Sequence, residues 1–264
     1  MSGPSICIAG AGSIGCYVGG MLRAGGRPVS LLARPRVIAD IKASGLTVTT
    51  FDGIEHRLSA GEIVLSDDPS ILADADIVLV TVKSDDTQAM ADLIARHARP
   101  HVTVVSLQNG VGNVPVLQNR LPGRAVLAGM VPFNVIALGH GHFHRATSGD
   151  ILIDRDANGT ADKISVRDLP VRVTANIIGV QWGKLLLNLN NALNALSGLP
   201  LRDQLAKREW RTLFADEMRE ALAALKAEGI VPVASTPLPA GWTPYILKLP
   251  DFAFRAVAAP MVKI

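Results

Sequence analysis

Three glycines near the start of the chain have the spacing of a phosphate-binding loop. Gly10, Gly12 and Gly15 fit the pattern G-x-G-x-x-G, with Ser13 and Ile14 between the last two. In such a loop the first glycine permits a sharp turn, the second lets backbone approach a pyrophosphate, and the third allows close helix–sheet packing. The following helix offers unpaired N–H groups and a positive dipole end to the phosphates. A strand before the loop and a helix after it favour a dinucleotide site over a simple glycine-rich turn.

The residue at the end of the second predicted strand distinguishes the two nicotinamide coenzymes. A site for NAD usually carries Asp or Glu about 20 residues after the loop, where it holds the ribose 2′-hydroxyl. Here that place is Arg34, 34 − 15 = 19 positions after Gly15. A guanidinium pairs with a 2′-phosphate, so the sequence predicts NADP(H). Arg36 could contribute to the same pairing, or it could be a solvated loop charge.

A polar stripe interrupts an otherwise apolar helical segment in the second half of the chain. Lys184 lies within the apolar run 182–189, and Asn188 and Asn191 follow it at positions i+4 and i+7. These spacings place the three side chains on one face of a helix. Inside a protein such a stripe must meet a cavity, a ligand or another domain. The alternative is a lysine that extends to solvent and two core amides that cap neighbouring backbone groups.

The elements that must position these residues change in character along the chain. Short apolar strands are predicted at residues 5–9, 28–33, 76–82, 101–107 and 125–135, with helices at 14–24 and 87–97. Residues 142–147 and 150–154 are predicted to form a final strand pair around a turn at Ser148-Gly149. Helical periodicity then dominates, with helices predicted at 182–196 and 210–228. This order predicts an α/β Rossmann-type dinucleotide-binding domain over residues 1–175 and an all-helical domain for substrate binding or dimerisation over 176–264.

Composition narrows the function classes. The chain has 264 residues, 48% hydrophobic and 19% charged, with a net charge of +3, which is typical of a soluble globular protein that accepts anionic small molecules. Its arginines are scattered without a basic stripe, which argues against nucleic-acid binding. No apolar run reaches the length of a membrane span, and no signal peptide is visible. Cys7 and Cys16 lack metal-ligand spacing and are expected to be reduced and buried, which favours a cytoplasmic protein.

Alternating histidines raise the question of a metal site. His140, His142 and His144 would share one face of a strand. No carboxylate or cysteine accompanies them, whereas a metal site needs three or four convergent ligands. We therefore expect an exposed row of histidines on an edge strand, and no metal.

Three motifs, in order along the chain, resemble those of ketopantoate reductases (2-dehydropantoate 2-reductases). They are T-V-K-S at residues 81–84, Q-N-G-V-G at 108–112 and W-G-K-L-L-L-N at 182–188. The glycine loop and Arg34 also match, so the resemblance spans the chain and stops only at its end. It implies NADPH-dependent reduction of the 2-keto acid ketopantoate to pantoate, on the route to coenzyme A.

The resemblance also implies roles for individual residues. Lys83 would reach the coenzyme and Asn109 would lie near both nicotinamide and substrate, as expected at the carboxyl ends of parallel strands. Read alone, Lys83 could be a surface charge and Asn109 part of a turn. Lys184 would act at the ketone, where a cationic amine polarises the carbonyl, binds the forming oxyanion and donates a proton. Asn188 matches a substrate-binding amide; the second such amide falls on Ala192, so we take Asn191 as its substitute.

The sequence departs from the family pattern near its end. Family members continue with a helical segment that holds a substrate-binding serine and a glutamate that assists the reaction; here the last glutamate is Glu228. The segment before Thr174 is also shorter, so a crossover helix that closes the sheet is expected to be lost. We therefore expect a C-terminally truncated reductase, whose exposed apolar surface would favour a homodimer. The alternatives are a reductase of another branched 2-keto acid and a non-catalytic NADPH-binding remnant.

Overall fold

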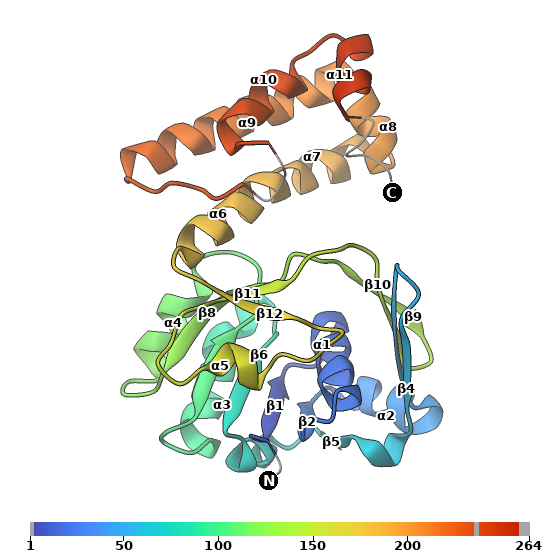
Figure 1. The fold of residues 1–264 in the computed structure, drawn as a ribbon, viewed down its shortest axis with the longest axis vertical. Helices are drawn as coiled ribbons and strands as arrows, with labels where there is room; N and C mark the ends of the chain where they lie inside the picture. The colour runs from blue at the N-terminus through green and yellow to red at the C-terminus, as the bar shows by residue number, and fades with distance from the viewer. Residues whose placement is uncertain (1–2, 235–237, 259–264) are drawn as a thin grey trace. The chain divides into compact units, whose positions relative to one another are not determined.

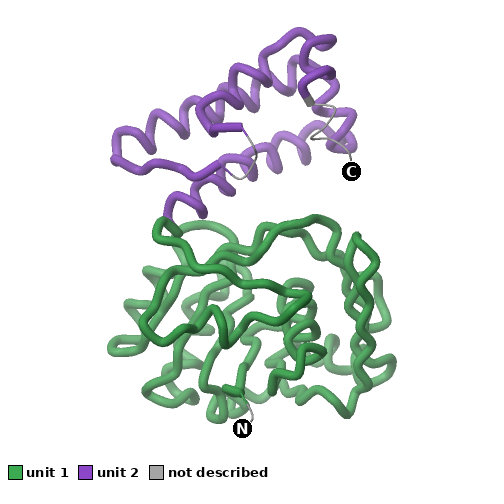
Figure 2. Tube along the Cα trace, viewed as in Figure 1, with its two compact units in different colours: residues 1–177 green, residues 178–264 purple. Residues whose placement is uncertain are grey.

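The computed structural model describes residues 3–234 and 238–258. The chain divides into two compact units, Met1–Ile177 and Ile178–Ile264 (Figure 2). The first is an α/β unit, and the described part of the second is helical (Figure 1). The predicted fold class, a Rossmann-type domain followed by an all-helical one, is confirmed.

Unit 1 is built on an eight-stranded sheet with the order β12-β11-β8-β7-β6-β1-β2-β5. Its strands are β1 (Ile6–Ala9), β2 (Val29–Leu32), β5 (Val64–Ser66), β6 (Ile77–Val80), β7 (Thr103–Ser106), β8 (Val126–Met130), β11 (Ile151–Asp154) and β12 (Val171–Thr174). Adjacent strands are parallel throughout the part of the sheet that consists of β8, β7, β6, β1, β2 and β5. Strand β11 pairs with β8 in the antiparallel sense. This parallel part has the strand order of a dinucleotide-binding fold, in which the direction of winding reverses between β1 and β6.

Helices cover both faces of this sheet, which explains why its central strands are continuous apolar runs. The helices of unit 1 are α1 (Ser13–Ala24), α2 (Pro35–Ser44), α3 (Thr87–His97), α4 (Asn113–Arg120) and α5 (Thr160–Lys163), with 3-10 turns η1 (Ala60–Glu62), η2 (Pro69–Asp74) and η3 (Ser84–Asp86). One apolar cluster packs α1 against one face, and another packs α3 and α4 against the other. The sheet therefore has a core on each side.

A second sheet that the sequence did not predict lies on the far side of α1 (Figure 1). It has the order β4-β3-β10-β9, from β3 (Leu46–Thr50), β4 (Glu55–Leu58), β9 (Val135–Gly139) and β10 (His142–Arg145). Leu46, Val48 and Phe143 of this sheet belong to the same buried cluster as Tyr17 and Met21 of α1. Helix α1 is thus enclosed between two sheets.

This second sheet corrects two strand predictions. The strand expected at 125–135 ends at Met130 as β8, and Val135 begins β9 in the other sheet. The strand pair expected across the Ser148-Gly149 turn is wrong, because β10 pairs with β3 and β9 whereas β11 pairs with β8 and β12. The cause is pairing between segments far apart in sequence, which local alternation does not encode.

The histidine row is also corrected. His142 and His144 are half-buried on β10, an inner strand, and the Thr49 hydroxyl lies 2.8 Å from His142 Nε2 and 2.9 Å from His144 Nδ1. His140 is exposed in the preceding turn, with φ of 51°. The two inner histidines therefore make hydrogen bonds within the sheet instead of an exposed edge row. Over residues 3–234 and 238–258, no three His, Cys, Asp or Glu side chains are placed to hold a metal ion.

The end of the large sheet is closed by a short crossover. Parallel strands need a crossover connection, and here the segment between β11 and β12 contains the one-turn helix α5. The expected loss of a crossover helix is therefore wrong, because the connection before β12 keeps a helix of one turn and β12 still pairs with β11.

The described part of unit 2 consists of α6 (Ile177–Asn188), α7 (Asn190–Ser197), α8 (Leu201–Ala206), α9 (Arg208–Ala227), α10 (Thr243–Leu247) and α11 (Asp251–Ala258), with a 3-10 turn η4 (Ala240–Trp242). The helix predicted over 182–196 is divided at Leu189, whose backbone is nevertheless helical (φ −53°, ψ −39°) and whose N–H still donates to Leu185. Within the described ranges, none of the helices has the length and apolar character needed to cross a membrane.

Buried polar groups fix the helices of unit 2. The guanidinium of Arg211 is fully buried and donates to the carbonyls of Leu205, Leu247 and Leu249 and to Asp251. It also lies 4.2 Å from the ring centroid of Phe254. This one side chain thereby links α9 by hydrogen bonds to α8 before it and to the segment from α10 to α11 after it.

Candidate functional site

The glycine loop connects β1 to α1, and its geometry suits a pyrophosphate. Gly10 has φ of 90°, and a Cβ there would overlap the Val82 side chain. A Cβ on Gly15 would lie 2.6 Å from Thr81 Oγ1 and 2.9 Å from Ile8 Cγ2. At Gly12 the nearest atom to such a Cβ would be 4.0 Å away, so the space beside it is open. The loop therefore has no room for a side chain at Gly10, where the chain turns, or at Gly15, where helix and sheet pack closely. It is open at Gly12, where a phosphate would approach the backbone.

The start of α1 supplies the donors for that phosphate. The Cys16 N–H donates to the Gly12 carbonyl at 2.8 Å. The N–H groups of Ser13, Ile14 and Gly15 come before the point at which intrahelical bonding begins. No acidic residue lies in the first turn of α1. These amides and the helix dipole therefore fit an anionic dinucleotide.

The other residues predicted for the coenzyme follow neighbouring parallel strands. Arg34 is exposed after β2, where it forms the extended N-cap of α2, and Arg36 is exposed two residues later. Lys83 is the exposed N-cap of η3 after β6, and Asn109 is exposed after β7. Because these strands are parallel, all four residues share with the glycine loop the carboxyl edge of the sheet. The structure thus brings together at one edge the set that the sequence proposes.

A buried hydrogen-bond network beneath this edge was not predicted from the sequence. Its side chains are almost wholly buried and belong to Thr87, Ser106, Gln108 and Asn113. The Gln108 amide nitrogen donates to the Val82 carbonyl at 3.1 Å and to the Thr87 hydroxyl at 2.7 Å. The network joins the loop after β6 to the loop after β7. In the sequence its members are polar residues at the end of a strand, in the loop after it or at the start of the next helix, where polar residues are equally expected in a solvated loop.

Lys184 lies on α6 of unit 2 and is half-buried. Burial lowers the pKa of its ammonium group below the ordinary value of 10.5. Asn188 is half-buried on the same helix, and Asn191 is exposed on α7. The predicted stripe therefore runs from a partly desolvated amine toward solvent within this unit.

The backbone next to Lys184 is in close contact with the segment that follows α9. The Val233 N–H donates to the Gly179 carbonyl at 2.8 Å. A Cβ on Gly183 would overlap the Val233 carbonyl oxygen and lie 2.9 Å from its carbonyl carbon. Gly183 thus permits a backbone crossing immediately before the lysine.

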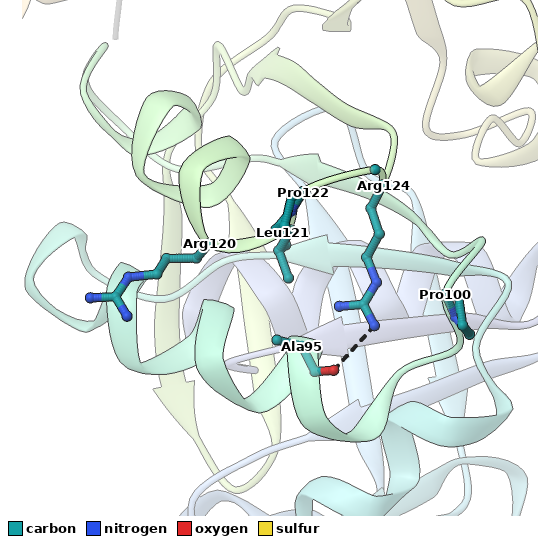
Figure 3. Close-up of a pocket in the computed structure, with 7 residues that line it drawn as sticks. Ala95, Pro100, Arg120, Leu121, Pro122 and Arg124 are labelled. Atoms are coloured by element: carbon teal, nitrogen blue, oxygen red, sulfur yellow. Dashed lines mark hydrogen bonds between the residues drawn. The ribbon is translucent and has the colours of Figure 1, made fainter.

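A pocket on unit 1 lies away from these residues and is lined by residues of α3, of α4 and of the segments before β7 and β8 (Figure 3). It is lined by residues that include Pro100 and Pro122, which precede β7 and β8 and so mark the opposite edge of the sheet. Its Arg124 donates to the carbonyls of Ile94, Ala95 and Ala98 at the end of α3. A cation at a helix C-terminus stabilises the helix dipole, so this arginine has a structural explanation.

The two cysteines are buried and free, as the sequence predicts. Burial raises the pKa of Cys7 to about 11 and that of Cys16 to about 12. Because the thiolate is the reactive form, neither thiol is suited to nucleophilic chemistry near neutral pH. Neither cysteine is therefore a candidate nucleophile.

The chain is similar to proteins of one known family over most of its length. The family model described as "Ketopantoate reductase PanE/ApbA" matches residues 6–158, and "Ketopantoate reductase PanE/ApbA C terminal" matches residues 176–250. The 2-dehydropantoate 2-reductase of Halobacterium salinarum is 30% identical over 234 residues, which are 85% of this chain and 76% of the relative. That of Archaeoglobus fulgidus is 31% identical over 199 residues, 73% of this chain but only 63% of the relative.

A solved structure extends the likeness to three dimensions. The PanE/ApbA family ketopantoate reductase of Ralstonia eutropha JMP134 is 32% identical and superposes with a TM-score of 0.81, over 97% of this chain and 80% of that one. The sequence match thus covers both units, and the fold agrees. The chain belongs to the ketopantoate reductase family of dinucleotide-binding oxidoreductases.

Proposed function

We propose that this protein reduces ketopantoate to pantoate with NADPH. The observation that carries the proposal is the match of both family models, one over residues 6–158 and the other over residues 176–250. The curated relatives that match it are named 2-dehydropantoate 2-reductases. We also propose a cytoplasmic location, supported by the two free thiols.

The preference for NADPH rests on the exposed Arg34 at the carboxyl end of β2. A guanidinium there would pair with the 2′-phosphate by charge and hydrogen bonding. Gly10, Gly12 and the amides of residues 13–15 would hold the pyrophosphate, with Lys83 and Asn109 further along the same edge. NADH lacks the 2′-phosphate and would lose the Arg34 contact.

The chemical role of this chain falls mainly on Lys184. The bound coenzyme supplies the hydride that reduces the C2 carbonyl of the substrate. The Lys184 ammonium would donate a hydrogen bond to the carbonyl oxygen, stabilise the negative charge that develops there and transfer a proton to it. Its lowered pKa makes it a stronger acid than an exposed lysine. Asn109, Asn188 and Asn191 would orient the substrate through its polar groups.

The proposal is tested by following NADPH oxidation by the purified chain with ketopantoate and, separately, with other branched 2-keto acids. We expect oxidation that depends on ketopantoate, is slower with NADH, and is lost in Lys184→Ala. Faster oxidation with a different 2-keto acid would overturn the substrate assignment. Binding of NADPH without turnover of any 2-keto acid would instead favour a non-catalytic coenzyme-binding protein.

A further inference from the structure

We propose that Thr87, Ser106, Gln108 and Asn113 form a positioning network that sets the two loops carrying Lys83 and Asn109. The inference deepens the proposed function and rests on it for the roles of those two residues. None of the four side chains needs to touch coenzyme or substrate. Their effect would pass through the backbone of the loops after β6 and β7.

The hydrogen bonds of the network run in one direction. The Ser106 hydroxyl donates to Gln108 Oε1 at 3.0 Å, and Gln108 Nε2 donates to the Thr87 hydroxyl at 2.7 Å. The Thr87 hydroxyl donates to Asn113 Oδ1 at 2.9 Å. Asn113 Nδ2 then donates to the Asn109 carbonyl at 2.7 Å. Each hydroxyl has only one proton to give, so each donor–acceptor choice constrains the next.

Two hydrogen bonds of the network hold backbone groups beside the proposed site. Gln108 Nε2 also donates to the Val82 carbonyl, one residue before Lys83. Asn113 Nδ2 donates to the carbonyl of Asn109 itself. Val82 in addition packs against Gly10, where it occupies the space that a Cβ would need. The network therefore connects three loops of the carboxyl edge of the sheet.

Burial makes the network sensitive to the loss of one member. Thr87, Ser106, Gln108 and Asn113 are each less than 9% exposed. A buried polar group that loses its partner cannot regain it from water, so it moves or draws in a different partner. Either response would shift a loop that must stay in place for coenzyme binding.

The test uses Thr87→Val, which removes the hydroxyl and keeps the shape. Thr87→Ser restores the hydroxyl. Thr160→Val is the matched control, since Thr160 is equally buried and donates to Asp156, but lies on α5 between β11 and β12. Ser106→Ala is a milder second variant should Thr87→Val fail to fold. The measurement is the dissociation constant for NADPH from fluorescence titration, below the unfolding temperature of every variant, together with kcat and KM.

We expect Thr87→Val to weaken NADPH binding about tenfold, which corresponds to about 1.4 kcal/mol. Ser106→Ala should weaken it by about threefold. Thr87→Ser should bind like the wild type, and Thr160→Val should lower the unfolding temperature without changing NADPH affinity. The inference is overturned if Thr87→Val and Thr160→Val bind NADPH alike. A wild type that binds NADPH but does not reduce ketopantoate contradicts only the substrate proposal, because the affinities still test the network.

Discussion

A methyl group added at Gly15 should destabilise unit 1, whereas one added at Gly12 should leave the fold intact and impair coenzyme binding. At Gly15 the new Cβ would lie 2.6 Å from Thr81 Oγ1 and 2.9 Å from Ile8 Cγ2. The Thr81 hydroxyl cannot simply retreat, because it donates to the Gly10 carbonyl at 2.9 Å. The substitution therefore crowds the helix–sheet contact and disturbs the turn of the loop.

The size of the effect follows from three opposing terms. Overpacking costs about 1–3 kcal/mol, and loss of the Thr81 hydrogen bond costs about 1 kcal/mol. Replacing glycine by alanine within a helix returns about 1 kcal/mol. The free energy of unfolding should therefore fall by about 1–3 kcal/mol. For a domain of this size the melting temperature should fall by roughly 2–12 °C.

At Gly12 the same methyl group meets no atom closer than 4.0 Å. Gly12 is the N-cap of α1, where alanine is a somewhat poorer cap, so we expect a stability loss below about 1 kcal/mol. The methyl group would, however, stand where the pyrophosphate must approach, and NADPH affinity should fall by about tenfold or more.

Thermal unfolding and NADPH titration of both variants provide the assay. We expect a low melting temperature for Gly15→Ala and weak NADPH binding by a thermally stable Gly12→Ala. Binding of NADPH by Gly12→Ala as tight as that of the wild type, or unfolding of Gly15→Ala at the wild-type temperature, would contradict these roles of the two glycines.

Three further predictions concern single residues. Arg34→Ala should raise the KM for NADPH by about tenfold or more and leave that for NADH nearly unchanged; equal effects on both coenzymes would contradict a 2′-phosphate contact. Because burial lowers the pKa of Lys184, its acidic form is lost as pH rises through a value below 10.5, so kcat should fall with a midpoint below that pH. This fall of kcat at high pH should be absent from the residual activity of Lys184→Arg. A pH profile of kcat in that variant that is the same as in the wild type would exclude Lys184 as the proton donor. Gly183→Ala should destabilise unit 2, seen as a lower melting temperature, because its Cβ would overlap the Val233 carbonyl oxygen; a wild-type melting temperature would mean that the segment can move away freely.

Local sequence patterns correctly predicted the elements that depend mainly on residues close together in the sequence. The predicted strand at 5–9 became β1, and the helix predicted at 87–97 coincides with α3. The strand at 5–9 is a continuous apolar run, which must be covered on both faces. Its sequence therefore indicates a strand within a parallel sheet. The glycine spacing predicted the turn between β1 and α1 for a similar reason, since its steric demands arise within one turn.

The second sheet shows where local patterns fail. β10 takes its partners from β3, nearly a hundred residues earlier, and from β9. Alternation in residues 142–147 indicated a strand but not its neighbour, so the nearest following strand was chosen wrongly. Burial on β10 depends on α1, which covers one face of that sheet. A strand partner is a property of the whole fold, not of the segment.

The buried network was invisible for a related reason. Gln108 and Asn113 follow a strand in a glycine-containing stretch, where polar residues ordinarily face solvent. Only the closeness of the loop after β6 turns them into an interior chain of hydrogen bonds. Sequence identified the residues at the rim of the proposed site and missed those beneath it.

NADPH oxidation by the purified chain, measured with and without ketopantoate in the wild type and in Lys184→Ala, decides whether the proposed reaction takes place. We expect oxidation that requires ketopantoate and disappears in the variant. Wild-type protein that binds NADPH, as shown by protection against thermal unfolding, yet does not oxidise it with ketopantoate would contradict the proposed reaction.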